Sequence, residues 1–185
     1  TRDAMLHRMK PEQWAEVTKT NYDSLFNMTR PLIDGMRARG YGRIINISSI
    51  GVLTNAPRFS AYVASKSALE AFSRCAASEF VDRGIDFTSI NMPLVKTPMI
   101  APTKLYNHVP TLTPEQAAAL VVEAIVYKPV RIATRLGIFG AISHAAAPRL
   151  TQIMLNTAFN MFPDSAAAKG VKEGEAPQQL SPEQM

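Results

Sequence analysis

Two short strand patterns separated by one long helix pattern constrain the fold of this chain more than any other feature. Residues 43–48 (RIINIS) and 86–91 (DFTSIN) are short runs rich in apolar and β-branched side chains, as expected for buried parallel strands. Residues 60–83 between them are rich in Ala and Ser and end before Gly84, a suitable left-handed cap. A strand, a helix and a strand at this spacing form a crossover unit. The sequence therefore predicts an α/β fold with a parallel sheet and helices on its faces.

A second long helix pattern precedes the first strand. Residues 11–39 are expected to form a helix that starts with Pro11 and stops at Gly40, and Pro31 is expected to bend or locally break it. Asn21 falls on the apolar stripe of this helix, so a polar side chain points toward the interior and needs a partner there. The apolar members of the stripe are Trp14, Val17, Leu25, Met28, Leu32 and Met36.

The rest of the chain is expected to belong to the same domain, up to a C-terminal tail. The further elements expected are a helix that starts at Thr113-Pro114-Glu115 and ends near Tyr127, a strand at 130–134, and helices at 137–147 and 149–162. After Pro163 the composition turns to Ala, Gly, Glu, Gln and Pro without periodicity, which is typical of a disordered tail. We therefore predict a domain over residues 1–162 and a tail over residues 163–185.

The charge distribution narrows the classes of partner. The net charge is +5, but Lys and Arg are scattered rather than arranged in a stripe, so nucleic acid is the least favoured partner. Residues 124–163 contain no acidic side chain, and this basic, Met-rich stretch could line a pocket for an apolar substrate that carries phosphates, with ordinary helix packing as the alternative. No segment is apolar enough to span a bilayer, although residues 136–162 could make peripheral contact with a membrane.

Cysteine and histidine usage excludes two further classes of site. The single cysteine, Cys75, excludes an internal disulfide framework and a multi-cysteine zinc site, and it favours a reducing compartment, here the cytoplasm. His7, His108 and His144 have no ligand spacing among them, so no metal site is expected.

Four residues form a pattern that suits carbonyl chemistry. Tyr62 and Lys66 are four residues apart and share a helix face, and a cation beside a phenol favours the phenolate. Ser49 lies at the carboxyl end of the first strand, where an open parallel sheet places its ligands, and could hold a carbonyl oxygen while Tyr62 protonates it. Asn21 could anchor a water that connects Lys66 to bulk solvent. A Tyr-x-x-x-Lys motif alone is common on helices, but the joint pattern is not.

This pattern resembles that of the short-chain dehydrogenase/reductases over most of the chain. Asn46-Ile-Ser-Ser49 is similar to the strand signature of that family, Tyr62-Val-Ala-Ser-Lys66 to its active-site motif, and Asn21 to the fourth member of its catalytic tetrad. The resemblance implies a Rossmann-type fold in which Tyr62 is the general acid/base and Lys66 supports it and binds the nicotinamide ribose. Ser49 would polarise the substrate carbonyl, and Asn21 would hold the relay water.

The resemblance also implies a cofactor and a missing part of the fold. NADP(H) is the expected cofactor, with NAD(H) as the alternative, and the backbone of Pro93 and Val95 and the side chain of Thr97 would contact its nicotinamide end. Leu94 stands where the family has glycine. In the family an Asn-Asn-Ala-Gly turn and a glycine-rich loop precede the position of Thr1, and this chain contains neither. Residues 1–162 are thus expected to be the C-terminal part of a Rossmann-type domain whose N-terminal glycine-rich half lies outside the chain, which would leave an exposed sheet edge.

Two subfamilies of reductase share the resemblance. Residues 1–49 are similar to acetoacetyl-CoA reductases, and residues 50–185 to the reductase module of bacterial fatty acyl-CoA reductases. The motifs are Met9-Lys-Pro-Glu-Gln-Trp for the first, and Gly51-Val-Leu-Thr-Asn-Ala-Pro-Arg-Phe and Lys128-Pro-Val-Arg-Ile-Ala-Thr-Arg-Leu-Gly for the second. The second stretch includes the substrate-side loops, so NADP(H)-dependent reduction of a fatty acyl-CoA to an aldehyde is the leading hypothesis.

Two alternatives to that hypothesis stay open at this point. One is reduction of a 3-oxoacyl-CoA to a 3-hydroxyacyl-CoA, and the other is a non-catalytic fragment that serves only as a binding module. The family resemblance further implies a homodimer or homotetramer assembled through the helices at 11–39 and 60–83.

Overall fold

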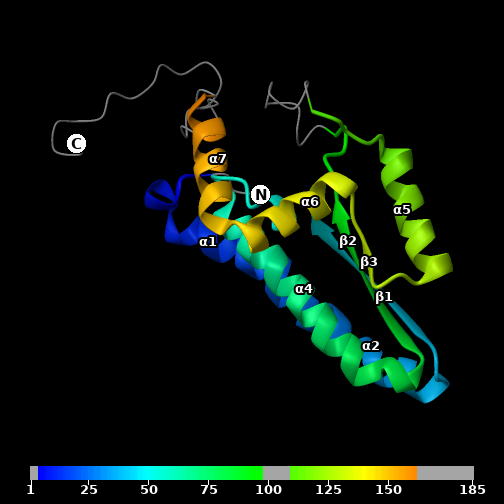
Figure 1. The fold of residues 1–185 in the computed structure, drawn as a ribbon. Helices are drawn as coiled ribbons and strands as arrows, with labels where there is room; N and C mark the ends of the chain where they lie inside the picture. The colour runs from blue at the N-terminus through cyan, green and yellow to red at the C-terminus, as the bar shows by residue number, and fades with distance from the viewer. Residues whose placement is uncertain (1–3, 98–108, 162–185) are drawn as a thin grey trace.

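A computed structural model describes residues 4–97 and 109–161 (Figure 1). Its described residues form a parallel sheet of three strands in the order β1 (Gly42–Ser49), β2 (Ile85–Met92) and β3 (Arg131–Ile132). Gly42 pairs with Ile85 and Ser49 with Met92, so β1 and β2 are in register along their full length. The expected parallel sheet is confirmed, whereas the expected tail at 163–185 lies outside the described residues.

Helices cover both faces of this sheet. Figure 1 shows α2 and α4 side by side on one face and α5 on the other, and both α4 and α5 contact β1 and β2. The α-helices are α1 (Pro11–Thr18), α2 (Ser24–Arg39), α3 (Gly51–Thr54), α4 (Ser60–Phe80), α5 (Pro114–Tyr127), α6 (Arg135–Ala146) and α7 (Pro148–Met161). Shorter turns are η1 (Leu6–Arg8), the π-helical η2 (Lys19–Asp23) and η3 (Val81–Arg83). No helix in the described part of the chain has the length and apolar character that a membrane span requires.

The predicted long helix over 11–39 is interrupted, but not at the expected place. Pro31 lies inside α2, which continues from Ser24 to Arg39 without a break. The interruption is η2, a π-helical turn that contains Asn21. Such wide turns inside helices are rare and occur frequently at functional sites.

The π-helical turn also changes which residues of this region are buried. Three members of the predicted stripe are exposed: Trp14, Met28 and Leu32. Val17, Leu25 and Met36 of the predicted stripe are buried as expected, and Thr29 and Ile33 are buried in place of the exposed members. A π-helical turn rotates less per residue than an α-helical one, so the face of α2 that is buried differs in part from the face that uniform α-helical spacing predicts.

A compact apolar cluster holds α2 and α4 against the sheet. Its buried members come from α2, α4 and β2 and are Ile33, Met36, Ala76, Ile85 and Phe87. The ring of Phe87 stacks on that of Phe80, with the ring centres 6.5 Å apart. Among the described residues β1 pairs with β2 alone, and the Ile47 side chain on β1 is 39% exposed. β1 is thus the edge strand of the described sheet.

Two glycines with left-handed backbones set the start of both long strands. Gly40 ends α2 with φ of 65°, and Gly84 follows η3 with φ of 69°. Gly42 donates its N–H to the carbonyl oxygen of Gly84 at 3.0 Å. A side-chain carbon at Gly84 would lie only 2.3 Å from the carbonyl oxygen of Gly40, whereas one at Gly40 would meet nothing within 4 Å.

These surroundings predict different costs for the same substitution. Gly40→Ala should lower the free energy of unfolding by about 1 kcal/mol, the usual cost of a left-handed non-glycine residue. Gly84→Ala should cost about 3 kcal/mol, because it adds a clash with the backbone at the point where β1 and β2 begin. Urea unfolding of both variants measures the difference. Equal losses would show that the two turns do not abut as described.

Candidate active site

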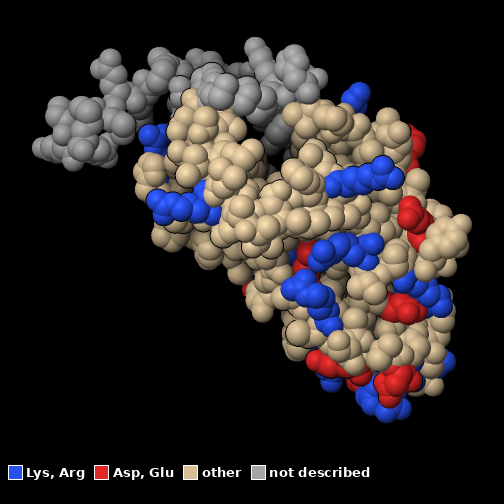
Figure 2. Space-filling view, in the orientation of Figure 1, with Lys and Arg blue, Asp and Glu red and all other residues tan. Residues whose placement is uncertain are grey.

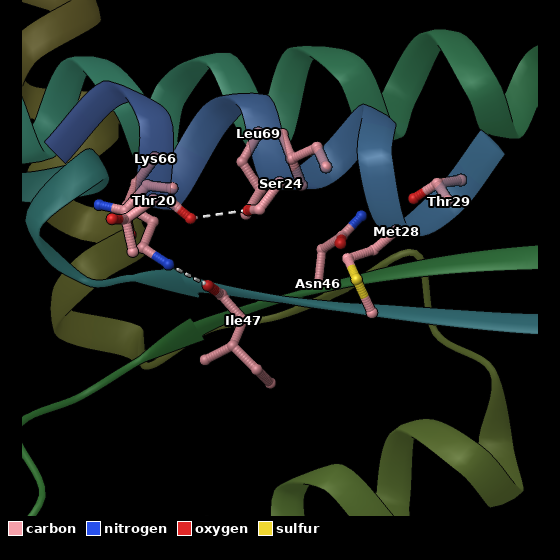
Figure 3. A pocket seen from close by; sticks show the side chains of 10 residues that line it. Thr20, Ser24, Met28, Thr29, Asn46, Ile47, Lys66 and Leu69 are labelled. Atoms are coloured by element: carbon pink, nitrogen blue, oxygen red, sulfur yellow. Dashed lines mark hydrogen bonds between the residues drawn. The ribbon is translucent and has the colours of Figure 1, made fainter. Parts of the chain in front are cut away.

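The predicted pair of Tyr62 and Lys66 lies on α4, where this helix crosses the carboxyl half of β1. The Nζ atom of Lys66 lies 6.0 Å from the centre of the Tyr62 ring. It donates a hydrogen bond of 2.8 Å to the carbonyl oxygen of Ile47 on β1 (Figure 3). The ammonium group is therefore held between the tyrosine and the strand, as the spacing of four residues predicts.

Lys66 is electrostatically unusual among the described side chains of this region. Burial of its ammonium removes part of its hydration and so lowers its pKa from the ordinary lysine value. The Ile47 carbonyl accepts one of its three N–H donors. A half-buried cation in this position can therefore still donate hydrogen bonds to a bound ligand.

Asn21 joins the π-helical turn η2 to the same part of α4. Its Nδ2 atom donates to Ser65 Oγ at 3.1 Å, and Ser65 Oγ donates to the carbonyl oxygen of Tyr62 at 2.7 Å. The inward orientation expected for Asn21 is confirmed, and its partner is Ser65. Ser65 lies within the Tyr62-Val-Ala-Ser-Lys66 motif but had no predicted role.

A hollow of about 270 Å³ opens between η2, α2, α4 and β1. Asn21 and Lys66 both line it, and so do Ser24 and Met28 from α2 and Asn46 from β1 (Figure 3). Its walls combine apolar side chains with a few amide, hydroxyl and ammonium groups, which is typical of small-molecule sites. Ser49 and Tyr62 are not among its lining residues.

Ser49 lies at the carboxyl end of β1, as the sequence predicts. Its Oγ atom accepts the backbone N–H of Gly51 at 3.1 Å. A side-chain carbon at Gly51 would lie 3.3 Å from this Oγ atom and 3.6 Å from a methyl group of Val63. Because Val63 follows Tyr62 directly, the absence of a side chain at Gly51 lets the Ser49 hydroxyl lie close to the first turn of α4.

The segment after β2 reaches the same edge of the sheet. Ile50 donates its N–H to the Met92 carbonyl oxygen at 3.0 Å, which ties the ends of β1 and β2 together. Beyond Met92 the chain pairs with Leu112, which donates to the carbonyl oxygen of Leu94 at 2.8 Å and accepts from the N–H of Lys96 at 2.9 Å. These bonds define the backbone path at Leu94, where the family has glycine. Pro93 and Val95 are half-buried and Thr97 is exposed.

One buried acidic residue near the site was not predicted from the sequence. Glu70 lies one turn after Lys66 on α4 and is only 3% exposed. The available signal was its position, because it shares the helix face of Tyr62 and Lys66 and so faces the sheet. In the described part of the chain, no three His, Cys, Asp or Glu side chains are grouped so that they could hold a metal ion.

Comparisons with known proteins give the same picture as the geometry. The family model for short chain dehydrogenases matches residues 1–106. The chain is 56% identical over 153 residues to a fatty acyl-CoA reductase of Acinetobacter baylyi, covering 83% of this chain and 52% of that protein. It is 43% identical over 109 residues to an acetoacetyl-CoA reductase of Rhizobium meliloti, covering 58% of this chain and 45% of that protein.

A further relative and a solved structure extend these comparisons. A fatty acyl-CoA reductase of Mycobacterium tuberculosis is 42% identical over 148 residues, with 78% of this chain and 50% of that protein covered. The chain thus spans about half the length of the curated relatives it matches. The crystal structure of a short-chain dehydrogenase from Streptomyces avermitilis superposes with a TM-score of 0.69 at 22% identity. That match covers 89% of this chain and 68% of the other, and it confirms the Rossmann-type fold.

The lowered pKa of Lys66 predicts a dependence of stability on pH. The folded protein disfavours the charged lysine, so between its lowered pKa and the unfolded value of about 10.4 the unfolded chain binds more protons. The penalty from Lys66 is therefore largest below this window and disappears above it. Urea unfolding of the wild type and of Lys66→Met should show that their difference in free energy of unfolding shifts in favour of the wild type as the pH rises. A difference that stays constant or shifts the other way would contradict this.

Proposed function

Because the chain belongs to the short-chain dehydrogenase family, we propose that it reduces the carbonyl of a CoA thioester with NADP(H), converting a fatty acyl-CoA to an aldehyde. The observation that carries the proposal is the position of Lys66 between the Tyr62 ring and the carboxyl half of β1. A cation fixed beside a phenol, at the edge of a parallel sheet where ligands bind, suits proton transfer to a carbonyl oxygen.

Tyr62 is the proposed proton donor. Its hydroxyl would protonate the carbonyl oxygen as negative charge develops there, and the Lys66 ammonium would stabilise the phenolate that remains. The burial that lowers the pKa of Lys66 also strengthens its electrostatic effect, because fewer water molecules screen its charge. Lys66 is held in place by the Ile47 carbonyl rather than by a carboxylate, so its positive charge is not neutralised by that contact.

Ser49 is the proposed second donor to the substrate oxygen. Its Oγ atom already accepts the N–H of Gly51, so its own O–H proton is available for a substrate carbonyl. Two hydroxyl donors on one oxygen would stabilise the developing oxyanion. In a thioester, collapse of the resulting tetrahedral hemithioacetal breaks the C–S bond and releases an aldehyde and the CoA thiol.

Asn21 is the proposed anchor of a proton relay. Its Nδ2 atom is engaged by Ser65, which leaves the amide oxygen to accept a hydrogen bond from a water in the hollow that Lys66 also lines. A water in that place could pass a proton from solvent to the Lys66 and Tyr62 pair. Asn21 lies within the π-helical turn, and its amide reaches α4 through Ser65.

Lys66, which lines the hollow, and residues near it outside the hollow fit the nicotinamide riboside end of the proposed cofactor. Lys66 retains donors for ribose hydroxyl groups, Tyr62 lies next to it, and the backbone of Pro93 and Val95 and the Thr97 side chain follow β2 at the same sheet edge. The bound nicotinamide would supply the hydride. Binding by Lys66 and Tyr62 would place that end of the cofactor where their proton chemistry takes place.

Two observations favour a fatty acyl-CoA as the substrate. The similarity to the fatty acyl-CoA reductase of Acinetobacter baylyi covers 83% of the chain, against 58% for the acetoacetyl-CoA reductase of Rhizobium meliloti. In Figure 2, red side chains do not gather over α6 and α7, while blue ones lie beside these helices. Several large apolar side chains of these helices are exposed, among them Phe139, Leu150 and Ile153. Apolar and basic groups together suit an acyl chain attached to phosphates.

The similarity to acetoacetyl-CoA reductase supports a second candidate, reduction of the ketone of a 3-oxoacyl-CoA. The same tyrosine, serine and lysine would serve it, and the C–S bond would stay intact. A non-catalytic binding module is the third candidate. Titration with NADPH, followed by nicotinamide fluorescence, tests this last possibility, since a module of that kind would give no change.

Tyr62→Phe should abolish reduction while it leaves the fold intact. The change removes one hydroxyl oxygen, so the turnover number should fall by about 10²–10⁴-fold, the usual contribution of general acid catalysis. Ser60→Ala, an exposed change on the same helix turn, is the matched control and should keep wild-type turnover. Both variants are assayed by NADPH oxidation. The protein used includes any sequence that flanks this chain in its gene. Retained turnover in Tyr62→Phe would refute the assignment of the proton donor.

Product analysis separates the two proposed substrates. With palmitoyl-CoA and NADPH, we expect free CoA thiol and aldehyde to appear in equal amounts, because the thioester bond breaks after reduction. With acetoacetyl-CoA, we expect much slower NADPH oxidation. A protein that converts acetoacetyl-CoA to a hydroxyacyl-CoA and leaves palmitoyl-CoA unchanged would favour the ketone reductase instead.

A further inference from the structure

The carboxylate of Glu70 is buried at the junction of α4 with β1 and β2. Its Oε1 atom accepts a hydrogen bond of 2.6 Å from Ser48 Oγ on β1 and a short one from Asn91 Nδ2 on β2. All three residues are at most 3% exposed. A buried carboxylate costs free energy unless its oxygens are hydrogen-bonded, and here both strands supply the donors.

The second oxygen of Glu70 faces two arginines. Its Oε2 atom lies 3.3 Å from Arg131 Nη2 on β3 and 3.9 Å from Arg74 Nη1 on α4. The Arg131 contact is also a hydrogen bond to the carboxylate. The two arginine side chains are 43% and 57% exposed, so water weakens both ion pairs. The donors to the carboxylate that are themselves buried are Ser48 and Asn91.

Asn91 extends this network to Ser49. Its Nδ2 atom, which donates to Glu70, also lies in hydrogen-bond contact with the carbonyl oxygen of Ser49 at 3.2 Å. Ser48, the other donor to Glu70, precedes Ser49 directly. The end of β1 is thus attached to Glu70 twice, once through a side chain of β1 and once through an amide of β2.

The position of Glu70 along α4 gives these bonds a consequence for the site. Tyr62, Lys66 and Glu70 follow one another at intervals of four residues, so they share one face of the helix. Apolar packing alone leaves a helix some freedom to slide along a sheet, whereas directional hydrogen bonds fix its position. The bonds of Glu70 therefore fix where the Tyr62 turn lies relative to Ser49.

We propose that Glu70 is a positioning residue, whose carboxylate sets the separation of the Tyr62 and Ser49 hydroxyl groups by tying α4 to the end of β1. The inference rests on the proposed function, in which both hydroxyl groups must reach one carbonyl oxygen. A displacement of about 1 Å in such an arrangement can cost about 100-fold in rate, even when its cause lies away from the reacting atoms.

Two substitutions of Glu70 separate hydrogen bonding from volume. Glu70→Leu removes both acceptor oxygens at similar size, whereas Glu70→Gln keeps one oxygen that can accept from Ser48 and Asn91. We expect the turnover number of Glu70→Leu to fall about 100-fold with KM changed less than about threefold, since positioning acts on the chemical step. Glu70→Gln should recover most of this loss.

Ser73→Ala is the matched control for a purely structural effect. Ser73 is buried on the same helix, and its Oγ atom accepts a 2.7 Å hydrogen bond from Asn46 of β1. This variant loses a comparable buried bond between α4 and β1 without touching Ser49, so its turnover number should stay unchanged. If turnover falls in proportion to the free energy of unfolding in all the variants, Glu70 only stabilises the fold and the proposal is wrong.

Hydrogen exchange in this chain tests the positioning without any assay of activity. The amide of Ile50 donates to Met92 and that of Gly51 to Ser49 Oγ, so both report on the end of β1. Glu70→Leu should raise the exchange rates of both amides about tenfold. This is the effect expected when the free energy of local opening falls by the contribution of about one hydrogen bond. Ser73→Ala should leave both rates unchanged.

The exchange measurement keeps the two proposals apart. If Glu70→Leu does not fold, Ser48→Ala replaces it, because it removes only one donor to Glu70 and should shift both rates in the same direction by a smaller factor. Unchanged rates at Ile50 and Gly51 overturn the positioning role even in an active reductase. Raised rates in a protein that reduces no CoA thioester would support the positioning and reject the proposed function.

Discussion

The parallel pairing of β1 with β2 is the interaction on which the rest of the structure depends. Its full register, from Gly42 opposite Ile85 to Ser49 opposite Met92, brings the carboxyl ends of both strands to one edge of the sheet. Everything in the candidate site is attached there: Ser49 at the end of β1, the Pro93 segment after β2, and α4 across both strands. α4 is also part of the crossover connection between the two strands. The connection that allows them to pair in parallel therefore also places Tyr62 and Lys66 at the edge of the sheet.

The contact between α4 and the sheet changes character along the helix. At its carboxyl half the packing is apolar, with Ala76 and Phe80 against Phe87. At its middle and amino half it becomes polar, with Ser73 bonded to Asn46, Glu70 to Ser48 and Asn91, and Lys66 to Ile47. Apolar packing supplies most of the stabilisation, and the polar contacts, which are directional, fix the position of the helix on the sheet. The polar half is the one that carries the proposed chemistry.

Much of the fold could be predicted because its signals are local. The β-branched runs, the cap at Gly84 and the helix start at Thr113 each depend on neighbours in sequence, and each is found close to where it was expected. The predicted stripe of the first long helix was wrong at Trp14, Met28 and Leu32. That prediction assumed uniform α-helical rotation, and the π-helical turn at Lys19–Asp23 breaks this assumption without any residue signature such as Pro or Gly.

The sequence by itself determined which side chains carry the proposed chemistry. Their residue types and spacing can be recognised from the period of one helix and the position where one strand ends. It also indicated the family, which the match to short chain dehydrogenases confirms. Only the tertiary structure decided how these groups are held: Asn21 by Ser65, Lys66 by a backbone carbonyl, and the end of β1 by Glu70 through Asn91. Such contacts join residues that are far apart in the chain, and their partners depend on the register and depth of packing, which no local pattern encodes.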